Sequence, residues 1–247
     1  MRLAIFFVTL ALLPAASYAD IVNGGFETGD LTGWTVSGVP GNVQVLANGG
    51  LAASDGSVKI NAPEGSHYAL LSNGPGDQGG SQDTSILTSG PYLVGANASI
   101  NFLFDFFTNE PSTAGGGNPD FYTISILQGG VSVATITSGD INGAQTTFPT
   151  VDCNLVFLVT SDATTLCTHS GLQSITNFDL SAYKGSVLQF QFLVSDALDN
   201  SFDSALLLDG VTGTGLTPFS PVPEPASYLP LLAAGILLHL ALRRRAF

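Results

Sequence analysis

The feature of the sequence that most limits its fold is an alternation of apolar and polar residues with a period of two. Four apolar residues occupy every second position of residues 100–106, and four more do so in residues 187–194. They are Ile100, Phe102, Phe104 and Phe106 in the first run and Leu188, Phe190, Phe192 and Val194 in the second. Successive side chains of a strand point to opposite faces, so this spacing predicts two strands that each bury one face.

Eight more segments have the apolar and β-branched composition of strands. They are residues 34–36, 43–46, 68–71, 121–127, 131–137, 155–160, 174–178 and 205–211. The connections between them are rich in Gly, Pro, Asn and Asp, as in residues 73–77 and 113–119, which is typical of turns between strands. We therefore predict an all-β fold in one domain over residues 20–220, a two-sheet antiparallel sandwich of the jelly-roll type.

The start of the chain has the pattern of a secretory signal peptide. Met1 and Arg2 precede an apolar run over residues 3–13, and small residues follow up to Ser17, Tyr18 and Ala19. A charged start, an apolar centre and a small-residue end are the three parts of such a peptide. We predict that residues 1–19 are removed on export and that Asp20 becomes the new N-terminus.

Basic residues are nearly absent between the two ends of the chain. Of the six Lys and Arg residues, only Lys59 and Lys184 lie outside the two terminal segments, whereas the chain contains 19 Asp and Glu residues. Nucleic acid and anionic membrane surfaces are bound through clustered Lys and Arg, so this composition excludes them as partners of the exported domain. Calcium ions and neutral polymers remain compatible with it.

The end of the chain has three parts in a fixed order. A polar motif over residues 222–227 is followed by an apolar run over residues 228–242 and then by Arg243, Arg244 and Arg245. The apolar run predicts a single transmembrane helix of about 22 Å, which is short of the roughly 30 Å hydrocarbon core. Arginines stay on the cytoplasmic side of a membrane, so these three would stop the chain from moving further through it. A transient anchor fits this short helix better than a permanent one, which is the alternative.

The motif Val222, Pro223, Glu224 and Pro225, the apolar helix and the basic stop together resemble the PEP-CTERM sorting signal of Gram-negative surface proteins. That resemblance implies export by the secretion machinery and transient anchoring in the inner membrane. It further implies that an exosortase recognises and cuts the tail and that the protein reaches the cell surface or the extracellular space. An association with extracellular polysaccharide is the partner that this setting suggests.

Residues 21–34, immediately after the predicted signal peptide, resemble the opening of carbohydrate-binding-module-like jelly rolls. The pattern predicts that Phe26 and Trp34 lie in the core and that Glu27 lies at the edge of the sandwich. The resemblance implies a structural calcium ion shared by Glu27 and Asp209, and this is the one cofactor the sequence suggests. Gly210 departs from the usual acidic or amide residue after Asp209. The alternative is that Glu27 only caps a turn.

Other acidic residues gather in the predicted loops. Residues 196–203 contain Asp196, Asp199 and Asp203, and Asp120 follows another loop. Their spacing is not that of an EF-hand, which needs oxygen ligands at alternate positions and a central Gly. Carboxylate oxygens at loop tips suit calcium, which is the alternative, but we interpret these residues as solvated loop acids.

Signals for catalysis are weak, and we predict no catalytic residues. Neither a G-x-S-x-G elbow nor an H-E-x-x-H motif is present, and His67 and His169 are the only histidines in the predicted exported domain. Three function classes remain: a non-catalytic surface or matrix protein, a dedicated carbohydrate-binding module, and a secreted glycoside or ester hydrolase. A sugar-stacking platform would need exposed tyrosines, for which the candidates are Tyr68, Tyr92, Tyr122 and Tyr183.

Cys153 and Cys167 are the two cysteines of the chain. In an exported protein such a pair predicts a disulfide, which stabilises the fold by about 3 kcal/mol on a chain-entropy argument. Metal binding is the alternative, but the spacing is not C-x-x-C.

We expect the denatured, unreduced protein to give no reaction with a thiol reagent. Reaction of both cysteines under these conditions would show that they are free.

Overall fold

The computed structural model of the chain describes residues 21–38, 42–49, 51–52, 59–73, 84–108, 120–140, 151–152, 166–196 and 204–219. The predicted signal peptide and sorting tail, Cys153 and the predicted strand over residues 155–160 lie outside the described residues. In the described ranges the regular structure is β-strand, apart from one short 3-10 helix at Ser181–Tyr183. No helix within these ranges is long and apolar enough to cross a membrane.

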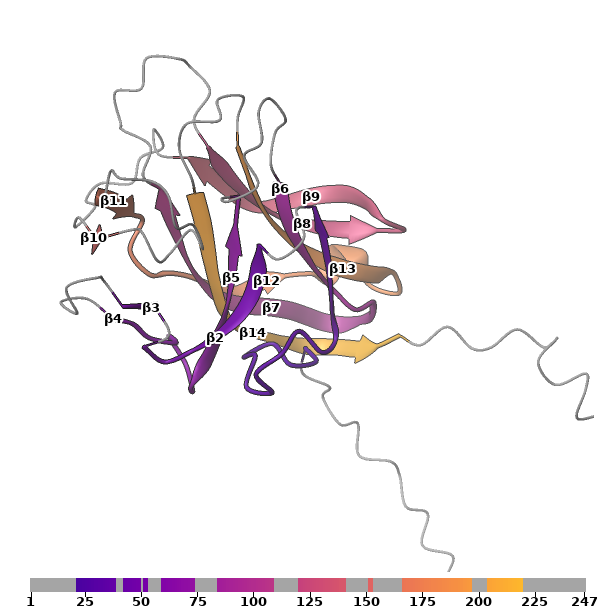
Figure 1. Cartoon of the computed structure of the whole chain (residues 1–247). Helices are drawn as coiled ribbons and strands as arrows, with labels where there is room; N and C mark the ends of the chain where they lie inside the picture. The colour runs from indigo at the N-terminus through magenta and orange to yellow at the C-terminus, as the bar shows by residue number, and fades with distance from the viewer. Residues whose placement is uncertain are drawn as a thin grey trace, which may run out of the picture.

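Two antiparallel layers form the body of the molecule (Figure 1). The first layer has the order β12-β7-β14-β5-β2, and the second has β1-β6-β13-β8-β9. Their bounds are Gln173–Asp179 (β12), Tyr92–Thr108 (β7), Ser204–Pro218 (β14), His67–Ser72 (β5), Val43–Ala47 (β2), Trp34–Gly38 (β1), Thr84–Ser89 (β6), Val187–Ser195 (β13), Phe121–Gln128 (β8) and Val131–Asp140 (β9). The predicted all-β, two-sheet antiparallel sandwich is thereby confirmed.

The two layers are joined at one corner. There Tyr92 and Leu93 of β7 pair with Leu188 and Val187 of β13, so one hydrogen-bonded path links strands of both layers. Four short strands complete the structure: β3 pairs with β4 in a separate two-stranded sheet, and β10 pairs with β11, which also pairs with the end of β7. Their bounds are Leu51–Ala52 (β3), Lys59–Ile60 (β4), Val151–Asp152 (β10) and Leu166–His169 (β11).

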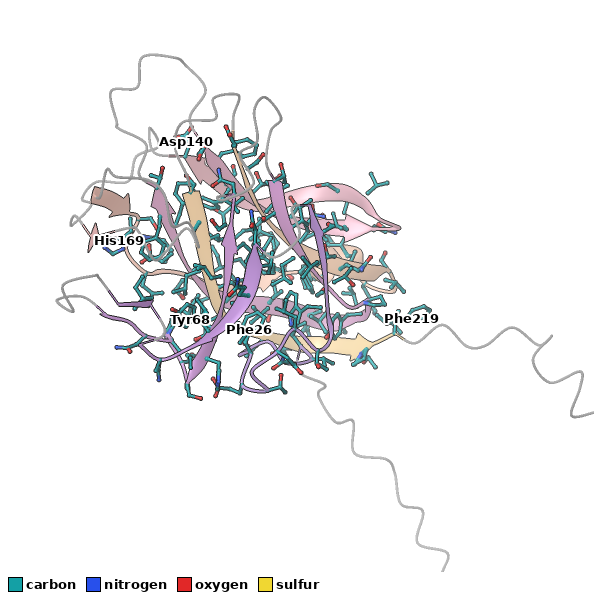
Figure 2. The ribbon with its side chains drawn as sticks, viewed as in Figure 1. Phe26, Tyr68, Asp140, His169 and Phe219 are labelled. Carbon is teal, nitrogen blue, oxygen red and sulfur yellow. The ribbon has the colours of Figure 1, made fainter. Side chains whose placement is uncertain are left out.

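The core lies between the layers and consists of the alternating residues predicted from the sequence. The eight inward positions of residues 100–106 and 187–194 are at most 3% exposed. Phe102 of the first layer meets Phe192 of the second edge-to-face, with ring centroids 5.4 Å apart. Phe26 and Trp34 are buried as predicted and pack at 5.4 Å from each other. Figure 2 shows side chains filling the space between the layers, with Phe26 towards one end and Asp140 at the other.

The structure differs from the sequence prediction in the four short strands β3, β4, β10 and β11, which were not predicted, and at three further places. β6 was missed, because its core-facing residues are two serines and one leucine, which gives little apolar signal. β7 begins at Tyr92, well before the strand that was predicted from Ile100. This earlier start was not predicted because a polar stretch with Gly95 and Asn97 interrupts the apolar pattern. Asp120 and Asp196 are 3% and 7% exposed, so our interpretation of these two as solvated loop acids is wrong. They continue the core-facing alternation of β8 and β13 beyond the ends of those strands.

Candidate binding site

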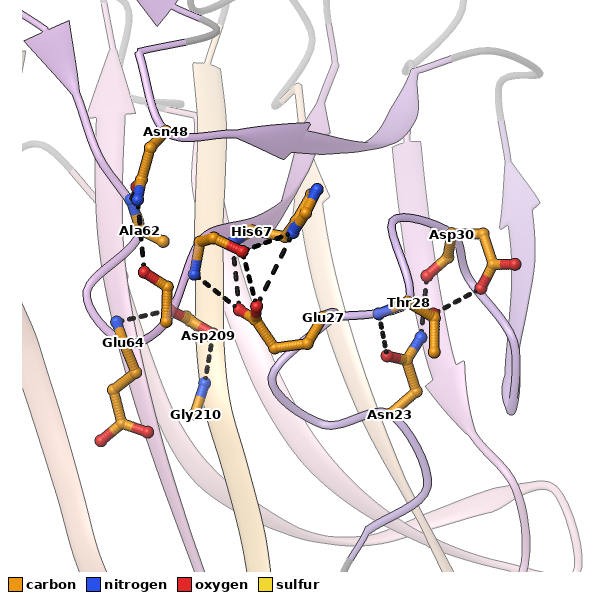
Figure 3. Close-up of polar contacts among 12 residues, drawn as sticks. Asn23, Glu27, Thr28, Asp30, Asn48, Ala62, Glu64, His67, Asp209 and Gly210 are labelled. Carbon is orange, nitrogen blue, oxygen red and sulfur yellow. Dashed lines mark hydrogen bonds and ion pairs between the residues drawn. The ribbon is translucent and has the colours of Figure 1, made fainter.

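The first segment of the described chain packs against the last strand. Residues 21–33 form a series of turns. The backbone N–H of Val211 in β14 donates a hydrogen bond to the carbonyl of Gly24 at 3.0 Å. The indole Nε1 of Trp34 donates to the carbonyl of Asn23 at 3.2 Å, which holds the turns against the core. This docking brings Glu27 and Asp209, far apart in sequence, to the same side of the sandwich (Figure 3).

Glu27 is held by hydrogen bonds from the turn that precedes β5. Its Oε1 accepts from the backbone N–H groups of Ser66 at 2.8 Å and His67 at 3.0 Å, and its Oε2 accepts from the Ser66 hydroxyl at 2.7 Å. These bonds, first of all the one from the Ser66 backbone, lower the pKa of Glu27 to about 2. Gly65 has φ +60, and a Cβ there would lie 2.3 Å from Glu27 Oε1, so only glycine fits under this carboxylate.

Asp209 is fully buried beside this network. Its Oδ2 accepts from the Glu64 N–H at 2.8 Å and its Oδ1 from the Gly210 N–H at 2.7 Å. The pKa of Asp209 is raised to about 6, mainly by burial. The two hydrogen bonds lower this pKa, and the charges of Glu64 and Glu27 add to the rise. In the part of the chain that the structure describes, no Lys, Arg or His forms an ion pair with Asp209.

Calcium ions take six to eight oxygen ligands, which allows a test of the implied site at Glu27 and Asp209. Every carboxylate oxygen of the two residues already accepts a hydrogen bond. Within the described ranges no group of three or more His, Cys, Asp or Glu residues is placed to hold a metal. The geometry favours a hydrogen-bond network over a shared ion, and calcium at this pair stays a prediction.

Two β-bulges lie near Asp209, one on each side of β7. β14 shifts register between Asp209 and Thr212, and β12 shifts between Ile175 and Phe178. Asn101 of β7 lies between them, since its Oδ1 accepts from the Asn177 N–H at 2.6 Å and its Nδ2 donates to Thr212 Oγ1 at 3.2 Å. Bulges occur often beside functional sites, because they interrupt the hydrogen-bond ladder and redirect side chains.

The two bulges border a pocket of about 230 Å³ on the outer face of the first layer. Its polar lining consists of one carboxylate, one amide and three hydroxyls, with Leu103 and Ile175 among the apolar members. The polar residues are Glu64, Asn101, Ser174, Thr176 and Thr212. Gly210 also lines the pocket, with φ +58, and a Cβ there would lie 3.0 Å from Glu64 Oε2. Glycine therefore lets the Glu64 carboxylate lie close over the bulge.

The tyrosines that could have formed a sugar-stacking platform are not available for one. Tyr68, Tyr92 and Tyr122 are at most 3% exposed, and Tyr183 is partly buried against the core. The hydroxyl of Tyr68 is buried without a hydrogen-bond partner, and burial raises its pKa. Any ligand of the pocket would therefore be held by hydrogen bonds rather than by aromatic stacking on these residues.

A second polar cluster does not have the arrangement of a catalytic triad. It consists of Asp105 on β7, His169 at the end of β11, and Ser170 in the turn after β11. His169 Nδ1 lies 2.8 Å from Asp105 Oδ2, and this contact raises the pKa of His169. The Ser170 hydroxyl donates to Asp105 Oδ1 at 3.0 Å instead of to the imidazole. The ring of His169 stacks on Phe107 with centroids 5.3 Å apart. A nucleophile must hydrogen-bond its base, so this arrangement orders the turn rather than activating a serine.

Several predicted residues lie outside the described part of the chain. These are the sorting motif Val222, Pro223, Glu224 and Pro225, the basic stop Arg243, Arg244 and Arg245, and Cys153. Cys167 lies in β11, where it pairs with Val151 of β10. The disulfide therefore stays a prediction. Sequence reasoning missed Glu64 and Asn101, because a single acid in a turn and a single amide in a strand carry no motif.

Comparisons with known proteins match two different parts of the chain. Residues 221–245 match the family described as the PEP-CTERM protein-sorting motif. No curated protein matches in sequence. Among solved structures, TmCBM61 in complex with β-1,4-galactotriose is similar at 14% identity over 78% of this chain and 95% of that chain, with a TM-score of 0.39. The K3 cleaved adhesin domain of Lys-gingipain from Porphyromonas gingivalis is similar at 11% identity over 79% of this chain and 99% of that chain, with a TM-score of 0.43.

Burial is the largest cause of the raised pKa of Asp209, and the charge of Glu64 adds a part that can be tested. Folding raises this pKa from 3.8 to about 6, so the carboxyl destabilises the fold as pH rises through that interval. Replacing Glu64→Gln removes one negative charge and should lower the pKa of Asp209, measured by NMR titration of its side-chain carboxyl carbon. Asp179→Asn removes the same charge at an exposed position and should leave that pKa unchanged. An unchanged pKa in the Glu64→Gln variant would contradict the assignment.

Proposed function

We propose that the protein is exported, sorted by an exosortase and retained at the cell surface or in the extracellular matrix, where its β-sandwich binds or scaffolds without catalysing a reaction. The observation that carries this proposal is the PEP-CTERM sorting motif at residues 221–245, which indicates export and sorting to the surface or membrane. The short apolar run of residues 228–242 supports transient anchoring in the inner membrane before the tail is cut.

The geometry of the described acidic and nucleophilic groups supports a non-catalytic role. Ser170 is bonded to Asp105, and Glu27 is held by three hydrogen bonds at the exposed edge of the sandwich. A glycosidase needs two carboxyl groups on either side of a bound sugar. The pocket contains one carboxylate, that of Glu64. A secreted glycoside or ester hydrolase is therefore the weaker alternative.

An association with neutral exopolysaccharide is the partner that the pocket and the charge support best. Hydroxyl and amide groups at the pocket can exchange hydrogen bonds with sugar hydroxyls, as polar groups in ligand sites commonly do. The 19 acidic residues of the chain would repel an anionic polymer. A dedicated carbohydrate-binding module is the closest alternative function, and the pocket is the observation that favours it.

Sorting is tested by a change in the tail motif. In the wild type, intact-mass analysis of the envelope fraction should find a chain without residues 1–19 and without the segment after about Pro225. In Glu224→Ala the tail should be retained and the protein should remain in the inner-membrane fraction. A mature wild-type chain that still carries Arg243, Arg244 and Arg245 would contradict sorting by cleavage.

Saccharide binding is tested by filling the pocket. Thr176→Trp places a large side chain at the exposed rim of the pocket, and Thr214→Trp places the same side chain at an exposed position of β14 outside it. The first variant should lose co-sedimentation with purified exopolysaccharide, and the second should keep it. Equal co-sedimentation of both variants and the wild type would move the contact away from this pocket.

A further inference from the structure

The turn before β5 holds a carboxylate at the pocket on the outer face of the first layer. Glu64 lies in this turn, and its backbone N–H donates to Asp209 Oδ2 at 2.8 Å. Asp209 Oδ1 also accepts from the Gly210 N–H at 2.7 Å, so one buried side chain positions two residues that line the pocket. Because Gly210 has no side chain, Glu64 Oε2 can lie close to the bulge of β14. The carboxylate is therefore held at the pocket by a fixed backbone.

The Glu64 carboxylate is not used by the protein itself. In Figure 3 its side chain extends away from the network around Glu27, and the one bond drawn to Glu64 goes to its backbone N–H. The ion pairs of the described residues join His67 to Glu27 and His169 to Asp105, and neither involves Glu64. Within those residues the carboxylate accepts no hydrogen bond either. It therefore remains free to bind a ligand.

Positive charge is absent from the described lining of the pocket. The residues that line it include no Lys, Arg or His. The ionisable groups beside it are acids, since the charges of Glu64 and Glu27 both act on Asp209. The whole chain adds to this field, because its 19 acidic residues far outnumber its six Lys and Arg. Such a field attracts cations to the pocket and repels anions from it.

The other polar groups of the pocket suit the hydroxyls of a sugar. Both ends of the Asn101 amide are engaged, and Thr212 Oγ1 accepts from Asn101 Nδ2 at 3.2 Å. The Thr212 hydroxyl therefore keeps its own proton to donate. The hydroxyls of Ser174 and Thr176 lie 3.2 Å apart, so one donates to the other and one proton stays available.

We propose that the pocket binds an amino sugar through the Glu64 carboxylate, with the protonated amine paired to it. The sugar hydroxyls contact Thr212 and Thr176, and the C–H groups of the ring lie against the apolar part of the lining, Leu103 and Ile175. An ammonium has three donors and no acceptor, and its bonds to a carboxylate are stronger than those between neutral groups. This mode of binding rests on the proposed association with exopolysaccharide and specifies which unit of an otherwise neutral polymer the pocket holds.

Other sugars fit this arrangement less well. The carboxylate of a uronic acid would meet Glu64 with no positive group in the described lining, and like charges repel. A sugar with only hydroxyls, or with an acetylated amine, would shield Glu64 from water without neutralising its charge, and this desolvation weakens binding. A free amine avoids both costs. Selectivity for the amine therefore depends on one side chain.

The test uses exopolysaccharide purified from the host and freed of protein, so that lysine ammonium groups do not contribute. Half of it is treated with acetic anhydride in water, which converts free amines to acetamides and leaves the sugar hydroxyls in place. Co-sedimentation of the protein purified from its host is measured against increasing amounts of each polymer. A chelator is present throughout, so that no metal ion bridges the carboxylate and the sugar.

Two variants are compared with the wild type. Glu64→Gln removes the charge but keeps the shape of the side chain and the backbone bond to Asp209. It should fold as the wild type does, because the carboxylate makes no bond within the described residues. Asp179→Asn is the matched control, since it removes an exposed carboxylate of β12 that does not line the pocket.

The wild type should bind the untreated polymer about tenfold more tightly than the acetylated one, as expected for a hydrogen bond between two charged groups. Asp179→Asn should keep this difference. Glu64→Gln should bind both polymers alike, with the affinity that the wild type has for the acetylated polymer. That remaining affinity would show that the variant is folded and that its pocket still accepts a sugar.

Two results would overturn the role of the amine. One is a wild type that binds the untreated and the acetylated polymer equally, and the other is a Glu64→Gln variant that keeps the preference for the untreated polymer. The polymer is still bound in both cases, so the proposed association with exopolysaccharide stands. Failure of that association looks different: the wild type binds neither polymer, or Thr176→Trp binds both as well as the wild type does. Amine recognition at the pocket then falls with it.

Discussion

The pairing of β7 with β14 is the interaction on which the rest of the structure depends. The two strands run antiparallel from Thr108 and Ser204 at one end to Tyr92 and Pro218 at the other. β7 also pairs with β12, β11 and β13, so strands of both layers take their register from it. Because side chains alternate between faces, this register decides which residues enter the core and which line the outer face. The pocket lies where the ladder on both sides of β7 is interrupted at the same level.

A shortage of basic side chains is the second constraint, and it acts through burial. Acids at the surface are solvated, but Asp105, Asp120, Asp196 and Asp209 are all at most 7% exposed. For two of these acids the compensating groups are known, and neither is an Arg or Lys. Asp105 has His169, and Asp209 has two backbone N–H groups. In a chain with few basic residues, buried acids therefore depend on backbone N–H groups and on histidine.

Sequence reasoning predicted the sandwich because the core-facing residues of its central strands are almost all large and apolar. Phe102 and Phe192 identify both their strands and their faces from spacing alone. It failed for β6, where Ser85 and Ser89 occupy core-facing positions, and for the buried acids at strand ends. There the alternation continues past the last apolar residue, and a carboxylate after a strand has the composition of a loop. The site residues Glu64 and Asn101 could not be found either, because bulges depend on pairing between distant strands.

The only tryptophan of the chain makes the fold unusually easy to observe. Trp34 contacts Phe26 at 5.4 Å and Phe192 at 5.9 Å between ring centroids, and its indole N–H is bonded to the carbonyl of Asn23. One chromophore thus touches the first turns of the described chain and the centre of the second layer. Its fluorescence should report the docking of these turns on the core with no background from a second indole, in the unlabelled protein.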